Sequence, residues 1–294
     1  MPDRVPDFRE LARALASEPG QQSLLPVIEK ELLHYGILNA MDEAGHLERL
    51  TFQGGTCLRL CYGAERFSED LDFCGGPGFS ASDFDDLAWT LVQALTSRYG
   101  LEVEVSSPGP RTPTGPVSVE TWWVKVTTAP ARPDLPKQRV SIQVANVSAH
   151  TREVQALRVR HSGLPTSYAG LLIVCESVEE ICADKLKAFA TSRFVRHRDL
   201  WDMRWLSLQP GFDQSQLQGL LGRKINDYQA QSEFAAGLDR VSQVGRIVED
   251  PAFLTQLARF LPASAAARTI LRPTFRSHVA QTVTALYRAA GVEV

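Results

Sequence analysis

Two carboxylates, Asp70 and Asp72, stand at alternate positions of one short apolar segment of the chain. Phe67, Leu71 and Phe73 flank them, which indicates a strand that is buried on one side. Alternate residues of a strand project from the same face, so both carboxylates point the same way. Carboxylates this close repel each other unless a cation lies between them, and a hard divalent ion such as Mg²⁺ is the usual solution. The pair therefore predicts a magnesium site.

A glycine pair precedes the carboxylates and predicts a place for phosphate. Gly54 and Gly55 stand between a short strand predicted over 50–53 and a helix predicted over 56–62, with Thr56 as its cap. Glycine lets backbone N–H groups approach a phosphate closely, and a helix N-terminus favours an anion. The alternative is a tight turn followed by a capped helix. The two interpretations are compatible, because the cap is what presents the N–H groups.

Hydroxyl and guanidinium groups near the glycine pair could also contact a bound triphosphate. Thr56 or Ser68 could donate a hydroxyl to the phosphates. Arg59 lies one turn into the predicted helix, where it would either reach phosphate or face solvent, and the same alternatives apply to Arg66. The candidate nucleotide-binding residues of this region are therefore Gly54, Gly55, Thr56, Arg59 and Ser68.

A second block of the chain strengthens this interpretation. It runs from Glu179 to Phe189 and continues at Arg198–Asp202. Together with Gly54–Thr56 and Arg66–Phe73, it resembles the signature of the polymerase-β-type nucleotidyltransferase superfamily. Within that superfamily the chain is similar to the AbiEii/AbiGii branch of abortive-infection toxins, which includes the MenT-like toxins. That branch has a helix with a motif lysine, followed by an Arg-Asp-x-x-Asp element.

The resemblance, which covers about residues 50–206, implies roles for the second block. Lys185 would contact the phosphates of the nucleotide; the alternative is a lysine that snorkels to the surface. Asp199 and Asp202 are three apart on a predicted helix and share a face, and the resemblance places one of them in the site. Spacing leaves open which one. Arg198 would hold these carboxylates or touch the substrate backbone. The candidate catalytic residues are Asp70, Asp72, Lys185, Asp199 and Asp202, with Asp70 and Asp72 as metal ligands.

One position departs from the family pattern. Many polymerase-β-type enzymes carry a third acid on a later strand, and the strand predicted here has Gln143 at the in-phase position. An amide is neither a carboxylate base nor an anionic metal ligand. Either Asp199 or Asp202 supplies the missing acid, or the attacking hydroxyl is activated more weakly.

Periodicity predicts the elements that position these residues. Alternation and β-branched content predict strands over 101–107, 118–128, 138–147 and 152–160, besides the strand at 71–73. Helical spacing predicts helices over 6–18, 21–45, about 82–99 and about 197–207, and one that begins at Ser177 with Glu180 as capping-box partner. Further helices are predicted throughout 213–290, with breaks near Gly222, Asp250-Pro251, Pro262 and Pro273.

Strands mixed with helices, followed by helices alone, predict an α/β (α+β) fold. The resemblance implies a polymerase-β-type nucleotidyltransferase core with a mixed sheet, plus a helical C-terminal domain. We predict a catalytic domain with N-terminal helices over 1–174, and a helical domain over 175–294 that contributes Lys and Asp to the site. The Pro/Gly-rich segment 106–116 is expected to be a hairpin connection or, alternatively, a lid over a substrate. Trp122 and Trp123 are expected to pack in the core and at the edge, or one of them could stack a base.

Charge restricts the function classes. The chain has 294 residues and a formal net charge of −3, so as a whole it is not a basic nucleic-acid binder. Residues 185–206 carry six positive and two negative charges, which suits either a polyanionic substrate or a solvated helix face. The sequence has no His-Glu-x-x-His, Gly-x-Ser-x-Gly or P-loop motif, which disfavours hydrolase and P-loop functions.

The cysteines predict a reducing environment. They are odd in number and form no Cys-x-x-Cys pair, which disfavours a zinc site or a disulfide framework and favours a cytoplasmic location. Cys57 and Cys61, four apart on the predicted helix, are expected only to pack. The early residues are acidic and lack a long apolar run, so we expect no signal peptide. No stretch reaches the roughly 20 apolar residues of a membrane span.

The resemblance implies a specific activity. The chain would be a Mg²⁺-dependent nucleotidyltransferase that transfers NMP from an NTP to an acceptor hydroxyl. The branch acts as toxins of toxin–antitoxin systems, and members add nucleotides to the 3′ end of tRNA, which blocks translation. The implied partners are therefore NTP, a tRNA acceptor and a cognate antitoxin protein. Two alternatives stay open: transfer to a protein or small molecule, or, given Gln143, a non-catalytic nucleotide-binding regulator.

Overall fold

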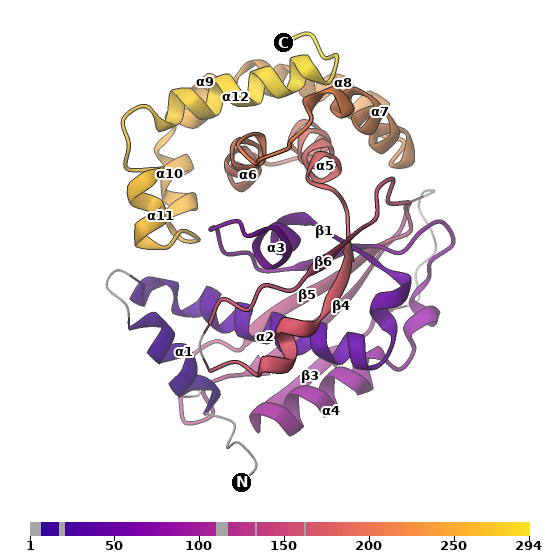
Figure 1. Ribbon diagram of the computed structural model, residues 1–294, viewed down its shortest axis with the longest axis vertical. Helices are drawn as coiled ribbons and strands as arrows, with labels where there is room; N and C mark the ends of the chain where they lie inside the picture. The colour runs from indigo at the N-terminus through magenta and orange to yellow at the C-terminus, as the bar shows by residue number, and fades with distance from the viewer. Residues whose placement is uncertain (1–6, 18–20, 110–116, 133, 162) are drawn as a thin grey trace. The chain divides into compact units, whose positions relative to one another are not determined.

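The chain divides into two compact units, each described by itself (Figure 1). The computed structural model describes residues 7–17, 21–109, 117–132, 134–161 and 163–294. Unit 1 holds the described residues up to Gly63 together with Phe67–Cys175, and unit 2 holds Ala64–Arg66 and Glu176–Val294. Unit 2 therefore consists of two separate segments of the chain: a short one of three residues and the whole C-terminal part.

Unit 1 is built on a mixed sheet of seven strands, in the order β3-β4-β5-β2-β1-β7-β6. The strands are β1 Thr51–Gln53, β2 Leu71–Cys74, β3 Glu102–Ser106, β4 Val119–Thr127, β5 Gln138–Ala145, β6 Glu153–Ala156 and β7 Leu172–Cys175. The pairs β2/β5 and β1/β7 are parallel, and the other pairs are antiparallel. The sequence pattern does not predict β7, because a run of four apolar residues beside a helix cap has no period of its own.

The helices of unit 1 pack around α2, which is buried on almost all sides. They are α1 Phe8–Ala16, α2 Leu25–Glu43, α3 Gly54–Cys57, a π-helical turn η3 at Leu58–Tyr62 and α4 Leu87–Tyr99, with short 3₁₀ turns η1 Gln22–Leu24, η2 His46–Arg49, η4 Ala81–Phe84 and η5 Thr166–Gly170. α2 packs against α4 and β5, and α4 packs against β3. A helix that is apolar all round belongs in a core, which is where α2 lies.

The strands at the centre of the sheet bury alternate residues. Leu71, Ile142 and Trp122 pair across β2, β5 and β4, and each is at most 1% exposed. The residues between them on the same strands project from the opposite face. The predicted core position of Trp122 is therefore confirmed, while its neighbour Trp123 is partly exposed on the other face, under the guanidinium of Arg139.

Unit 2 contains only helices among its described residues. They are α5 Val178–Thr191, α6 His197–Ser207, α7 Leu217–Asp227, α8 Gln231–Ser242, α9 Val244–Glu249, α10 Pro251–Ala258, α11 Ala263–Arg268 and α12 Phe275–Ala289, with a 3₁₀ turn η6 at Gln214–Gln216. α5 packs against α6, α7 and α8, and α12 packs against α6 and α9. In Figure 1 the later helices of this unit run around α5 and α6, which carry the second candidate block.

Local signals explain most of the boundaries in unit 2. Ser177 caps α5 by accepting a hydrogen bond from the Glu180 N–H at 3.2 Å, which confirms the predicted cap. The breaks at the prolines are also confirmed, because α10 begins at Pro251 and Pro262 caps α11. The predicted break near Gly222 is wrong, since α7 runs through it. A mid-helix glycine costs only about 1 kcal/mol, and the buried leucines of α7 outweigh that cost.

Candidate active site

The two predicted metal ligands lie on one polar row of the unit 1 sheet. Asp72 is in β2 directly opposite Gln143 of β5, and Asp70 immediately precedes β2. The Ser141 hydroxyl donates a hydrogen bond to Asp70 Oδ1 at 2.6 Å, and Gln143 Nε2 donates to Ser141 Oγ at 3.0 Å. Both aspartates are half-buried. Gln143, at the predicted position of the third acid, thus helps to orient the carboxylate of Asp70.

Gly54 lets the carboxylate of Asp72 lie against the backbone. Its φ is +77°, a left-handed conformation that L side chains rarely adopt. A Cβ at this position would lie 2.7 Å from Asp72 Oδ2, well inside van der Waals contact. The partner of Asp72 on the other side is Gln53 of β1. The glycine turn and the carboxylate strand are therefore in direct contact, and the absence of a side chain at residue 54 makes room for the carboxylate of Asp72.

The donor atoms of this row fit a hard divalent cation. Asp70 and Asp72 offer carboxylate oxygens on the same face, and an ionised carboxylate accepts at several lone-pair positions. The bond from Ser141 to Asp70 therefore leaves acceptor capacity. Oxygen ligands from one or two carboxylates are what Mg²⁺ takes in nucleotide-dependent enzymes.

The two predicted hydroxyl donors differ in their surroundings. Thr56 is 1% exposed, and its hydroxyl donates to the backbone carbonyl of Asp70. The prediction that Thr56 caps the helix is wrong: α3 begins at Gly54, and Gln53 occupies the cap position without a side-chain hydrogen bond. The helix therefore begins two residues earlier than composition indicates. Ser68 is partly exposed on the segment that leads to Asp70.

Arg59 does not face solvent, so that alternative is wrong. It is 4% exposed and makes two hydrogen bonds to Glu31, from Nε at 2.7 Å and from Nη2 at 3.1 Å. Its guanidinium also stacks over the Phe67 ring at 4.1 Å. Burial alone would raise the pKa of Glu31, but Arg59 and His161 outweigh it and lower the pKa to about 2. This ion pair joins the helix of the glycine turn to α2. A phosphate contact of Arg59 stays a prediction.

The second candidate block forms a buried ionic cluster inside unit 2. Lys185 Nζ lies 2.8 Å from Asp199 Oδ1 and 2.9 Å from Asp202 Oδ2. Arg66 makes a two-pronged contact with Asp202, at 2.8 Å from Nε and 2.7 Å from Nη2, and Arg196 pairs with Asp199. Lys185 is 7% exposed and Arg66 3%, so the snorkelling lysine and the solvent-facing Arg66 are both wrong.

The charges in this cluster hold each other ionised. Burial alone would lower the pKa of Lys185, but the carboxylates of Asp199 and Asp202 outweigh it and raise the pKa above its ordinary value. Burial alone would raise the pKa of Asp202, but Arg66 and Lys185 hold it well below its usual range. Lys185 and Arg196 lower the pKa of Asp199 in the same way. With three cations and two carboxylates, the cluster carries one net positive charge, which suits an anion.

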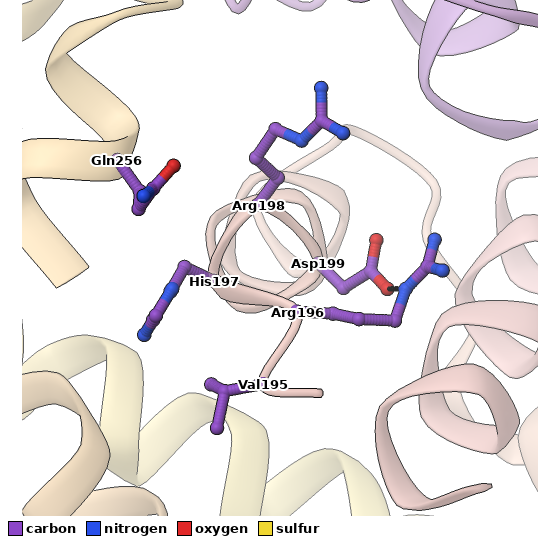
Figure 2. Close-up of a pocket in the computed structure, with 6 residues that line it drawn as sticks. All are labelled: Val195, Arg196, His197, Arg198, Asp199 and Gln256. Atoms are coloured by element: carbon purple, nitrogen blue, oxygen red, sulfur yellow. Dashed lines mark hydrogen bonds and ion pairs between the residues drawn. The ribbon is translucent and has the colours of Figure 1, made fainter. Parts of the chain in front are cut away.

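A pocket of about 370 Å³ opens beside this cluster at the N-terminus of α6. Its lining residues are Val195, Arg196, His197, Arg198, Asp199 and Gln256. Figure 2 shows Arg196 turned toward Asp199, whereas Arg198 points away from that pair. Arg198 stacks over the Phe260 ring at 4.6 Å. Among the described contacts, Arg196 is therefore a residue that holds Asp199, and the predicted roles of Arg198 stay predictions.

The positive charge of residues 185–206 is only partly on the surface. Lys185 and Lys187 are each 7% exposed, and Lys187 pairs with Asp184 at 3.1 Å. Arg193 and Arg196 are exposed. Counting charges along the sequence thus overstates the basic surface, because two of the lysines neutralise buried carboxylates.

Two residues that matter here are not among the site residues predicted from the sequence. Ser141 orients Asp70, and its signal was available, because it alternates with Gln143 on the predicted strand. Arg196 holds Asp199, yet in the sequence it is one of several arginines in a basic run. The structure brings the candidates into two clusters: Gly54, Asp70, Asp72 and Gln143 in unit 1, and Lys185, Asp199 and Asp202 in unit 2.

Comparison with known proteins gives a family and two structural relatives. The profile described as "AbiEii: Nucleotidyl transferase AbiEii toxin, Type IV TA system" matches residues 36–281. MenT4, a nucleotidyltransferase toxin from Mycobacterium tuberculosis H37Rv, has a similar structure, with a TM-score of 0.57, 18% sequence identity, and coverage of 95% of this chain and 92% of that chain. JHP933 from Helicobacter pylori follows, with a TM-score of 0.50, 17% identity, and coverage of 90% and 93%. No curated protein sequence matches the chain. The MenT4 likeness confirms the predicted mixed α/β fold with C-terminal helices.

Proposed function

Because the chain belongs to the AbiEii nucleotidyl transferase toxin family of type IV toxin–antitoxin systems, we propose that it adds NMP from an NTP to the 3′ end of tRNA. Family membership confirms the resemblance stated from the motifs and makes the chain a nucleotidyltransferase. The tRNA acceptor, the resulting block of translation and the Mg²⁺ requirement are our proposals.

The observation that carries the proposal is the oriented carboxylate pair. Asp70 and Asp72 share a face, Ser141 holds Asp70, and Gly54 makes room for Asp72. These two aspartates would hold Mg²⁺, which when bound would neutralise triphosphate charge and orient the attacking hydroxyl. The backbone of Gly54 and Gly55 would pass close to the phosphates, which is the usual use of a glycine turn at such a site.

In unit 2 we assign the anion-binding role to the cluster around Lys185. Its net positive charge favours a phosphate group, and Lys185 and Arg196 can exchange a carboxylate partner for a phosphate oxygen. Cations engage both oxygens of each aspartate, but only Asp199 lines the pocket. Of the two candidate acids, Asp199 is therefore the one we place next to a ligand, with Asp202 holding Lys185 in position.

Two exposed arginines support an RNA acceptor. Arg193 and Arg196 present positive charge to solvent, which suits the phosphate backbone of an RNA acceptor.

Gln143 favours a second candidate function, a nucleotide-binding regulator, because an amide stands opposite Asp72 where an acid would complete the site. The two candidates differ in whether label moves from NTP to an acceptor.

We also propose a cognate antitoxin protein as partner and the cytoplasm as location. The family description names a toxin–antitoxin system, and the five cysteines, all among the described residues, are buried and outside any disulfide, as suits a reducing compartment. Among the described residues, no helix is long and apolar enough to cross a membrane. Expression of the chain should arrest growth.

The test incubates the purified chain with Mg²⁺, each α-³²P-labelled NTP in turn and total tRNA, followed by a denaturing gel. We expect label on tRNA with one NTP, and no label with the Asp70→Asn variant or with EDTA. Asp134→Asn is the matched control, because Asp134 is exposed in the same unit and pairs only with Arg132 in the contacts observed. Tight NTP binding without transfer to any RNA would favour the regulator or another acceptor.

A second pair of variants tests the acceptor separately. Arg193→Glu should raise the KM for tRNA, while Arg223→Glu, an equally exposed change on α7, should not. Equal KM values for tRNA in the two variants would contradict the proposed contact of Arg193 with the RNA backbone.

A further inference from the structure

Three cysteines from separate elements meet inside unit 1, away from the carboxylate row. Cys57 ends α3, Cys61 lies in the π-helical turn η3, and Cys175 is the last residue of β7. Their sulfur atoms all lie within 4.8 Å of one another. Each residue is at most 1% exposed. The expectation that Cys57 and Cys61 only pack overlooks Cys175, which the parallel pairing of β1 with β7 brings to them.

The cluster has the composition of a soft-metal site. Thiolate ligands select soft ions such as Cu(I), whereas carboxylate and carbonyl oxygens suit Mg²⁺ and Ca²⁺. Within the part of the chain that the structure describes, these three sulfurs form the one group of metal-ligating side chains this close together, and no histidine or carboxylate joins them. A structural zinc site takes four ligands in a tetrahedron, so a set of three sulfurs matches a three-coordinate ion better.

The surroundings supply a partly exposed segment next to Cys61 and a nearby positive charge. The π-helical turn that carries Cys61 is a rare backbone conformation, and such turns often occur at functional sites. Tyr62, which ends the turn, and Gly63 are partly exposed. The Arg158 N–H donates to Leu60 O at 2.8 Å, and its guanidinium lies over Gly63. Three thiolates around one Cu(I) ion would leave two net negative charges, and this guanidinium would offset one of them.

We propose that Cys57, Cys61 and Cys175 bind one Cu(I) ion through their three sulfurs. The bound ion ties β7 to the helix that begins at Gly54. Since the unfolded chain does not hold the three thiols together, Cu(I) binding stabilises the folded protein.

The test titrates the reduced, full-length protein with Cu(I) under anaerobic conditions, in competition with bicinchoninate. We expect one equivalent bound per chain, a three-sulfur environment by X-ray absorption at the copper edge, and a higher Tm. Cys61→Ala should lose the bound equivalent. Cys74→Ala is the matched control, since Cys74 is equally buried in the same unit but outside the cluster, and it should bind as the unaltered chain does.

Two results would overturn the proposal. One is an unaltered chain that leaves all Cu(I) with bicinchoninate or shows nitrogen or oxygen ligands at the metal. The other is a folded Cys61→Ala variant that binds as tightly as the Cys74→Ala control. Circular dichroism checks folding, and Cys175→Ala replaces Cys61→Ala if the latter does not fold. The absorption spectrum of the unaltered chain decides the question without any variant.

Discussion

Replacing Gly54 by alanine separates two costs that the structure assigns to this position. The first is conformational, because φ is +77° and a side chain in the left-handed region costs about 1–2 kcal/mol. The second is a collision, because the new Cβ would lie 2.7 Å from Asp72 Oδ2. Gly45 isolates the first cost. It has φ +76° in the same unit, and nothing lies within 4 Å of the Cβ it would gain.

The collision determines the effect on activity. Ordinary contact between nonbonded heavy atoms begins near 3.5 Å, so the Asp72 carboxylate must move by about 0.5–1 Å. Catalytic groups must be held within about 0.5 Å, and a 1 Å misplacement costs on the order of 100-fold in rate. We therefore expect Gly54→Ala to lower nucleotidyl transfer by about 10- to 100-fold. Gly45→Ala should keep near-normal activity, although it loses about 1–2 kcal/mol of unfolding free energy, and Gly54→Ala should lose at least as much.

The assay measures the initial rate of label transfer from α-³²P-NTP, alongside urea unfolding of both variants. Urea unfolding of Gly45→Ala measures the conformational cost alone, and any larger loss in Gly54→Ala is the cost of the collision. The reasoning is refuted if Gly54→Ala transfers label at the normal rate, or if Gly45→Ala loses as much activity as Gly54→Ala.

Three further perturbations follow from the same contacts. Ser141→Ala removes the hydrogen bond to Asp70 Oδ1, and since bonds to charged groups contribute about 1.5–3 kcal/mol, kcat should fall by roughly 10-fold or more while NTP affinity changes little. Lys185→Met leaves two buried carboxylates short of a partner and should cost about 3–5 kcal/mol of unfolding free energy, whereas Lys137→Met at an exposed pair should leave the urea midpoint nearly unchanged. Glu31 has its pKa lowered from 4.5 to about 2, so its contribution to stability is present above pH 4.5 and is lost as the pH falls toward 2. A Glu31→Gln variant should show a flatter dependence of Tm on pH in that window, and an unchanged acid slope would contradict the pairing.

Local chemistry in the sequence was sufficient for several features of the site. Strand alternation places Asp70 and Asp72 on one face wherever that strand lies in the sheet. Ser177 caps α5 because the acceptor and the N–H it binds are three residues apart. The prolines end helices in unit 2 for an equally local reason, since proline lacks an N–H and restricts the residue before it. The motif resemblance rests on the same kind of short segments, and the family match confirms it.

Partners that are distant in the sequence were decided only by the tertiary structure. Arg66 meets Asp202 across 136 residues, and no periodicity signals that pairing. Arg59 looks like a surface residue until α2 places Glu31 beside it. Cys175 joins Cys57 and Cys61 because β7 pairs with β1, and a strand of four residues leaves no pattern to predict it. Sequence thus determined which side chains share a face of one element. The order in which elements pack determined which charges are neutralised and which thiols meet, because that order depends on burial summed over the whole chain.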